Sequence, residues 1–143
     1  MKFNKNYCVA IVLTLIGLLL FASCDSKEKY DYYADKDNYI SVVGTVSYIK
    51  QSEDAATLYL EFDNMSVQLS ENFFKVVGDN YIILQERMGS AGIRLGDQLE
   101  FVTAPRYFGD GYVMPIVSIC REETVLLELQ DGVENLLRWL DSQ

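Results

Sequence analysis

The sequence contains no histidine among its 143 residues. Ser-His-Asp and Cys-His nucleophilic catalysis, histidine general-base chemistry and nearly all zinc enzyme sites require that side chain, so the sequence excludes them. Basic residues are also few, with 12 Lys and Arg against 21 Asp and Glu. Binding to nucleic acid phosphates requires clustered Lys and Arg. We therefore expect no nucleic acid partner, no metal and no cofactor, and no motif predicts a catalytic residue.

The start of the chain has the order of charge and hydropathy of an export signal. Lys2 and Lys5 precede an apolar run at residues 8–21, which is followed by Ala-Ser-Cys at 22–24. A positive start, an apolar stretch of roughly 7–15 residues and small residues at the cleavage site define a secretory signal peptide. The run is shorter than the roughly 20 residues that a membrane-spanning helix needs.

The Ala-Ser-Cys sequence at 22–24 resembles the bacterial lipobox, in which the chain is cut before the cysteine after its sulfur has received a diacylglyceryl group. Phe21 departs from the usual leucine but keeps a bulky apolar side chain. The resemblance implies that residues 1–23 are a lipoprotein signal peptide and that acylated Cys24 anchors the mature chain on the outer side of a bacterial membrane. Two or more acyl chains anchor a protein stably. An uncleaved membrane helix and a secreted chain cut after Ser23 are the alternatives.

Cysteine is scarce once this processing is taken into account. Cys8 leaves with the signal peptide and Cys24 carries the lipid, so Cys120 is the one thiol left and no disulfide forms within a mature chain. Cys120 ends an apolar run and is expected to be buried. Loss of two lysines with residues 1–23 changes the net charge from −9 to −11.

Residues 24–38 are dense in charge and tyrosine and show no apolar periodicity. This composition is typical of a solvated linker. Asp31, Asp35, Asp37 and Asn38 suggest a calcium loop at first sight, but their spacing lacks the central glycine and final glutamate of an EF-hand. We therefore expect a flexible acidic, tyrosine-rich tether at 24–38 and a single globular domain at 39–143.

From residue 39 the sequence becomes rich in β-branched and aromatic residues. In residues 57–63, Leu58, Leu60 and Phe62 alternate with more polar positions, and this period of two is typical of a half-buried strand. A strand is also expected at 39–50, and Gly44 within it predicts a bulge or a sharp bend. Further strands are expected at 98–103, 111–119 and 124–129.

The middle of the domain is ambiguous. Apolar runs at 73–77 and 81–84 flank a Gly-Asp-Asn sequence and predict a hairpin with a three-residue loop. The alternative is a helix that begins at Ser70 and stops at Gly78. Residues 85–91 suit a short helical turn before the next strand.

The end of the chain changes to a helical period. Asp131-Gly132 predicts a turn, and a helix is expected directly after it. Trp139 lies off the apolar face of this helix, where it would cover the rim of the domain. Four apolar residues fall at i, i+3, i+4 and i+7, on one helical face: Val133, Leu136, Leu137 and Leu140.

Five to six short strands, a helical turn between the third and fourth, and a C-terminal amphipathic helix predict a mainly β domain. The element order over residues 39–120 resembles the OB-fold, a small Greek-key β-barrel. Another small barrel or a β-sandwich capped by the C-terminal helix is the alternative. The Gly-Asp sequences and the segment 106–112 also resemble small lipoproteins of gut-type bacteria, a resemblance that implies no activity.

One loop is a candidate contact surface. Loops hold binding residues more often than strands do, and exposed aromatics are favoured anchors. In an OB-like barrel this loop joins the last two strands, at a mouth that binds oligonucleotides or sugars. In the purely structural alternative, Tyr107 and Tyr112 pair across a hairpin and Phe108 closes the barrel end. The candidate residues are Arg106, Tyr107, Phe108, Asp110 and Tyr112.

Two functional hypotheses follow from these observations. The favoured one is a non-catalytic binding or interaction module, held at the cell envelope by lipid, with a glycan or an envelope protein as its partner. The alternative is a cell-wall hydrolase with two carboxylates roughly 5–10 Å apart, for which Asp110 facing Glu100 or Glu61 would be the pair. A third hypothesis, close to the first, is a structural subunit of an envelope complex.

Overall fold

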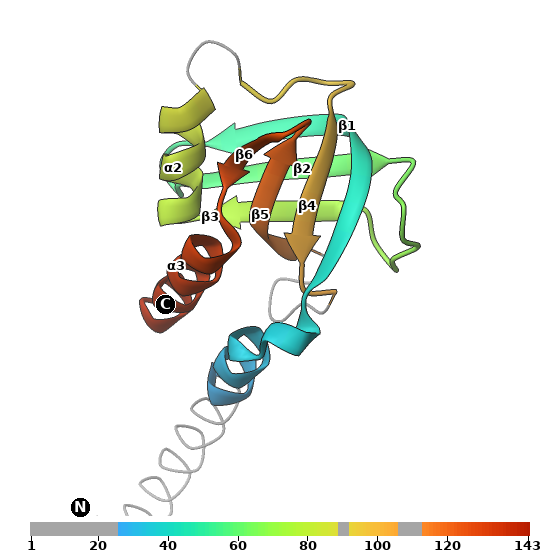
Figure 1. Ribbon diagram of the computed structural model, residues 1–143. Helices are drawn as coiled ribbons and strands as arrows, with labels where there is room; N and C mark the ends of the chain where they lie inside the picture. The colour runs from blue at the N-terminus through green and yellow to red at the C-terminus, as the bar shows by residue number, and fades with distance from the viewer. Residues whose placement is uncertain (1–25, 89–91, 106–112) are drawn as a thin grey trace, which may run out of the picture.

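The computed structural model of this chain describes residues 26–88, 92–105 and 113–143. Within them the protein is mainly β, with six strands in one sheet and a helix near the C-terminus, as the sequence predicts (Figure 1). A further helix spans residues 26–34. The remaining elements are η1 (Lys36–Asn38), β1 (Ile40–Ser52), β2 (Thr57–Asp63), β3 (Phe73–Val77), α2 (Asp79–Met88), β4 (Gln98–Thr103), β5 (Met114–Arg121), β6 (Thr124–Leu127) and α3 (Leu129–Asp141).

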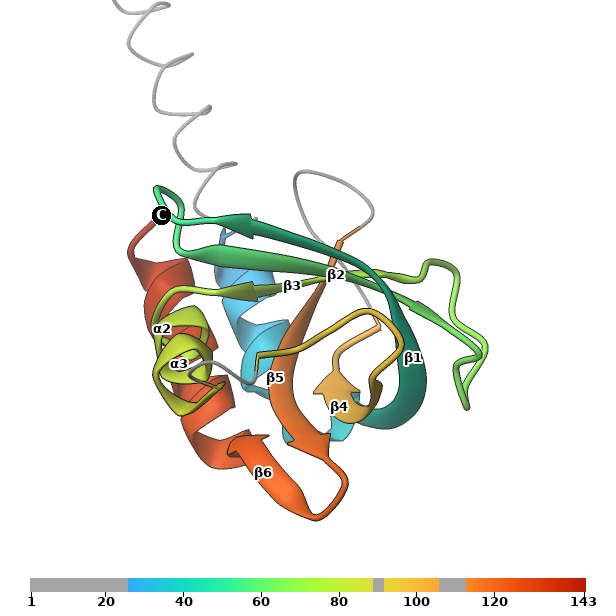
Figure 2. The same ribbon diagram turned by 90° about the horizontal axis from the view of Figure 1, so that it is seen from above.

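The sheet closes on itself. Its strand order is β3-β2-β1-β4-β5-β6, and all neighbours in that order are antiparallel. The two ends meet because β3 also pairs with β5, in parallel, through Phe74 with Met114 and Lys75 with Pro115. β1, β2, β3, β5 and β4 therefore form a closed ring of five strands, and β6 extends the sheet beside β5. Figure 2 shows the ring from above, with β6 on the side opposite β2.

β1 holds the ring together because it pairs with two strands in turn. Residues 40–45 pair with β4, and residues 45–52 pair with β2. Gly44 lies at this change of partner, where an added Cβ would come within 3.0 Å of the Phe62 Cβ. The register shifts between residues 46 and 48, so a bulge lies close to the glycine, as predicted.

The interior of the ring is filled by aromatic and aliphatic side chains. The rings of Phe62 and Phe101 stack with centroids 4.2 Å apart, and Phe74 meets both edge-on. Tyr81 and Leu84 of α2 join this core from one end. In β1, β2 and β3, buried residues largely alternate with more exposed ones, so the other side chains of these three strands lie on the outside of the ring.

α2 corrects the predicted hairpin. The third strand is present at residues 73–77, but residues 81–84 belong to a helix and not to a returning strand. Tyr81 and Leu84 are buried while Ile82 is 45% exposed, which is the three-residue spacing of a helix. The predicted helical turn that follows is the second half of α2, from residue 85 to 88.

α3 packs against the outer side of β5 and begins earlier than predicted. Its first residue is Leu129, so the expected turn at Asp131-Gly132 is wrong. An added Cβ at Gly132 would overlap the carbonyl oxygen of Val117, which means that the helix backbone lies directly on the strand backbone. Glycine at this position permits the contact. The predicted apolar face is confirmed, because Val133 and Leu136 are buried and Leu137 and Leu140 pack beside them.

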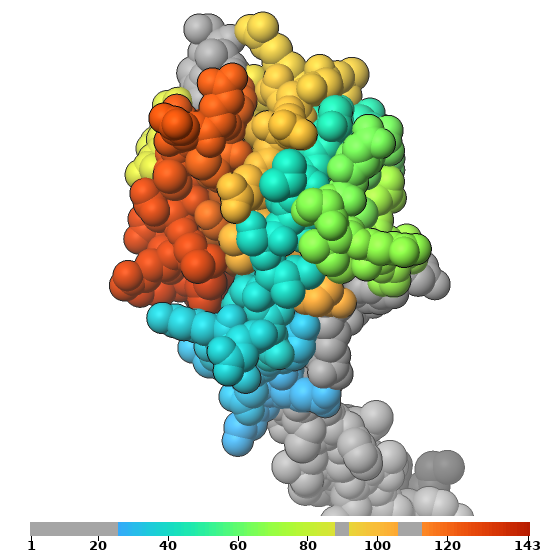
Figure 3. Space-filling view, turned by 45° about the vertical axis from the view of Figure 1, so that its right-hand side comes forward, coloured from blue at the N-terminus to red at the C-terminus, as the bar shows by residue number. Residues whose placement is uncertain are grey.

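The segment before β1 also differs from the sequence expectation. Residues 26–34 are helical, and Tyr33 is only 4% exposed because it packs into the apolar cluster beneath α3. Figure 3 shows this blue segment and η1 lying against the end of the strand ring. The described part of 24–38 is therefore folded onto the domain, in place of the predicted flexible tether.

Candidate functional site

The residues that the sequence predicted as site residues lie outside the described part of the chain. Residue 24 precedes the first described residue, and segment 106–112 falls between two described ranges. The lipidation site, the candidate loop and any pairing of Asp110 with another carboxylate therefore stay predictions. The residues concerned are Cys24, Arg106, Tyr107, Phe108, Asp110 and Tyr112.

Two other residues that the sequence singled out are described. Cys120 is half-buried, and its Sγ contacts the carbonyl oxygen of Glu122 at 3.2 Å, so the expectation of a buried thiol is wrong. It lies near the end of β5, next to the turn into β6, where the strand leaves the core. Glu100 is exposed on β4 and accepts a hydrogen bond from the Ser41 hydroxyl at 2.8 Å.

The outward side chains of β1, β2 and β3 form an ordered array. In β2, Leu58 and Leu60 are buried in the ring and Tyr59 between them points outward. Residues directly opposite each other in adjacent strands lie on the same face. The register therefore places two rows across the three strands, Lys50–Tyr59–Lys75 and Tyr48–Glu61–Phe73.

Three aromatic rings of this array contact one another, and we call Tyr48, Tyr59 and Phe73 the aromatic face. Tyr59 and Phe73 are stacked, with ring centroids 5.7 Å apart and an interplanar angle of 15°. Tyr48 meets Phe73 at 6.4 Å and 57°. Tyr48 is 41% exposed, and the other two rings are half-buried. The stack orders the rings while leaving part of their surface accessible to a ligand.

Charged groups surround the aromatic face. Lys50 and Lys75 lie on either side of Tyr59, and Glu61 lies between Tyr48 and Phe73. The Lys75 Nζ also lies 5.1 Å from the centroid of the Trp139 ring, so α3 continues the array beyond β3. The sequence predicted only that Trp139 covers the rim of the domain, and this contact places its ring beside Lys75 of β3. The array thus combines flat apolar surface with two ammonium groups and one carboxylate.

This arrangement has the composition of a recognition surface. Binding sites for small molecules are lined by aromatic surface with a few polar groups that fix orientation. The aromatic face and the charged groups around it lie on three hydrogen-bonded strands, which hold them in fixed positions. Within the described residues, no three His, Cys, Asp or Glu side chains are grouped so as to hold a metal ion.

Sequence reasoning missed the aromatic face. The alternation in residues 57–63 indicated that Tyr59 lies on the polar side of a strand. It did not indicate that β1 and β3 flank β2, which is what brings Tyr48 and Phe73 beside that ring. The one local signal was aromatic residues at outward positions of three predicted strands.

Comparison with models of protein families, with curated proteins and with solved structures found no match for this chain. Among the described residues, no helix has the length and apolar character needed to span a membrane. The geometry of the site and the sequence are therefore the grounds for the function proposed below.

Proposed function

We propose that this chain is a lipoprotein of the bacterial cell envelope that binds carbohydrate, without catalysis, on its aromatic face. The anchor in this proposal is acylated Cys24, supported by the lipobox resemblance at residues 22–24. The observation that carries the binding function is the stack of Tyr59 on Phe73 at 5.7 Å on the outer side of the sheet.

The strand order supports an OB-like barrel. β1, β2, β3, β5 and β4 close in that order, β3–β5 is the one parallel pair among the described strands, and α2 stands between β3 and β4 in the chain. OB-folds are small Greek-key barrels that bind oligonucleotides and oligosaccharides on the face of their second and third strands. Tyr59 and Phe73 lie on the second and third strands here, with Tyr48 beside them on the first.

Charge favours carbohydrate over nucleic acid. The chain has a net charge of −9, which opposes the approach of a phosphate backbone. Sugar rings are neutral or carry isolated charges, and their apolar faces can lie on aromatic rings. The ammonium groups of Lys50 and Lys75 and the carboxylate of Glu61 are then placed to bind hydroxyl or carboxylate groups at the edges of the sugar ring.

The binding function is tested by titrating soluble envelope polysaccharides and peptidoglycan fragments into the mature domain by calorimetry. We expect Tyr59→Ala and Phe73→Ala each to weaken binding at least tenfold, which is about 1.4 kcal/mol. The matched control is Val125→Ser, which removes a 42% exposed apolar side chain from β6, on the opposite side of the molecule (Figure 2).

Each outcome bears on a separate part of the proposal. Glycan binding that is lost in Tyr59→Ala and kept in Val125→Ser supports it. Equal binding by wild type and both aromatic variants would remove the aromatic face from the proposal. If no glycan binds, carbohydrate is the wrong ligand class.

The anchor is tested separately, by mass spectrometry of the native protein, which should find residues 1–23 removed and Cys24 acylated. The Cys24→Ser variant should be absent from the membrane fraction.

A further inference from the structure

The helix at residues 26–34 is fixed to the domain at its C-terminal end. Tyr33 is 4% exposed and belongs to an apolar cluster with Ala104, Val117 and Leu136. Tyr32 packs against the same cluster and meets the Tyr33 ring edge-on at 5.2 Å. Through two consecutive tyrosines, the helix therefore joins an apolar cluster that also contains residues of β5 and α3.

The last turn of this helix is also held by hydrogen bonds from the chain that follows it. The Asn38 side-chain amide donates to the carbonyl oxygen of Tyr32 at 2.9 Å, and the Tyr39 hydroxyl donates to that of Tyr33 at 2.7 Å. Carbonyls at a helix C-terminus lack intrahelical partners, so these bonds stabilise the end of the helix. Burial of Tyr39, together with the nearby Tyr33 and Tyr32, raises the pKa of its phenol, which keeps this donor protonated.

From this packing we infer that helix 26–34 is a rigid stalk that seats the domain close to the bilayer in one orientation. The inference rests on the proposed acylation of Cys24, which precedes the described part of the helix by two residues in the sequence. A helix rises 1.5 Å per residue, so the stalk extends the anchor by about 14 Å. An extended tether over residues 25–38 would reach roughly 50 Å.

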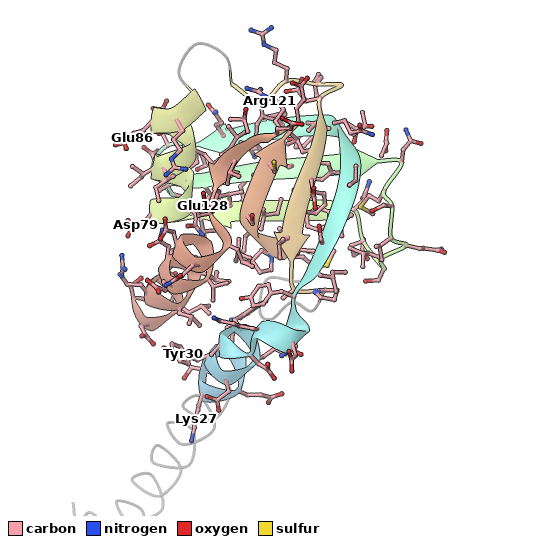
Figure 4. The ribbon with its side chains drawn as sticks, in the orientation of Figure 1. Lys27, Tyr30, Asp79, Glu86, Arg121 and Glu128 are labelled. Atoms are coloured by element: carbon pink, nitrogen blue, oxygen red, sulfur yellow. The ribbon has the colours of Figure 1, made fainter. Side chains whose placement is uncertain are left out.

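The surface that meets the lipid headgroups is the part of the stalk that lies farthest from the sheet. Figure 4 shows Lys27 on this part of the helix, pointing away from the domain, with Tyr30 on the side of the helix. Lys27 is exposed and Tyr30 is half-buried. Tyrosine rings and lysine side chains are typical of protein surfaces at the membrane interface.

Trypsin distinguishes a docked stalk from a swinging tether, because cleavage after Lys27, Lys29 or Lys36 releases the domain from the membrane and a docked helix resists cleavage. The acylated protein is bound to phosphatidylcholine vesicles, trypsin is added, and the domain left in the sedimented fraction is followed over time. We expect Tyr33→Ala to be released at least tenfold faster than wild type. Asp31→Ala, at an exposed position of the same helix, is the matched control and should be released at the wild-type rate.

A milder variant keeps the test valid if Tyr33→Ala fails to fold. Tyr39→Phe removes one hydrogen bond and leaves the ring in place, and it should raise the release rate about fivefold. Energy transfer from Trp139 to dansyl-labelled lipid is the second readout and should fall in the variants that undock the stalk. Equal rates of domain release and equal energy transfer in the wild type and all three variants would overturn the proposed rigid stalk. Failure of the wild type to sediment with vesicles would instead overturn the proposed anchor.

Discussion

Gly132 is subject to two effects of opposite sign within α3. Replacing a glycine inside a helix by alanine normally stabilises the protein by about 1 kcal/mol, because the unfolded chain loses backbone freedom. At this position the added methyl group would overlap the carbonyl oxygen of Val117. Overpacking of this kind costs about 1–3 kcal/mol, and more where backbone must move. We expect the second effect to win, so that Gly132→Ala lowers the free energy of unfolding by about 2 kcal/mol.

Urea unfolding followed by Trp139 fluorescence measures this change. Glu134→Ala is the control, since it alters an exposed position of the same helix and should stay within about 0.5 kcal/mol of wild type. A Gly132→Ala variant as stable as wild type, or more stable, would show that α3 lies farther from β5 than the structure has it.

Gly132 also shows why one part of the fold was not predictable. In the sequence, Asp131-Gly132 has the composition of a turn, and the predicted helix therefore began after it. The reason for the glycine lies in Val117, which is far away in the chain and touches the helix only in the folded state. Local composition carries no information on such a contact.

α2 and α3 are joined by a buried pair of amides. The Asn135 side chain donates to the Oδ1 of Asn80 at 2.9 Å, and the Asn80 side chain donates to the carbonyl oxygen of Gly132 at 2.9 Å. Asn80 is fully buried and Asn135 is 8% exposed. Removing one partner of a buried hydrogen bond leaves the other unsatisfied, which costs about 1–3 kcal/mol. We expect Asn135→Ala to destabilise the protein by about 2 kcal/mol.

A double-mutant cycle separates the interaction from the loss of each side chain. Asn80→Ala and Asn135→Ala together should cost less than the sum of the two, with a coupling energy of about 1 kcal/mol or more. The exposed ion pair between Arg138 and Asp79, which joins the same helices at 2.9 Å, provides the comparison, and its coupling should be below about 1 kcal/mol. If the losses of stability in Asn80→Ala and Asn135→Ala are additive in the double variant, the two amides do not stabilise each other.

Individual strands were predictable and their pairing was not. Residues 57–63 and 98–103 form strands with the bounds expected, because alternation of apolar and polar residues is a local signal. Residues 81–84 were placed in a strand because four apolar residues in a row suit either a buried strand or a helix. The aromatic face depends on β1 and β3 flanking β2, a long-range arrangement that no window of sequence contains.

At the scale of the whole molecule, the folded unit begins before β1. The sequence placed the start of the domain at residue 39, but Tyr33 is buried in the cluster that α3 covers. Burying an aromatic side chain of this size stabilises a protein by about 2 kcal/mol. A chain beginning at residue 36 should therefore be about 2 kcal/mol less stable to urea than a chain beginning at residue 25. Neither chain contains Cys24, so the comparison is independent of acylation.

The same stability difference determines how rigid the stalk is on a membrane. If docking of helix 26–34 contributes about 2 kcal/mol, the helix is undocked in about 3% of molecules at any moment. On the proposed anchor, a domain docked in this way would keep one orientation to the bilayer for nearly all of the time, with its aromatic face at a fixed height. An Asp31→Ala chain beginning at residue 25 should match the wild type of the same length, since Asp31 is exposed. Should the chains beginning at residues 25 and 36 unfold at the same urea concentration, helix 26–34 contributes no stability, and the domain would swing freely on its anchor.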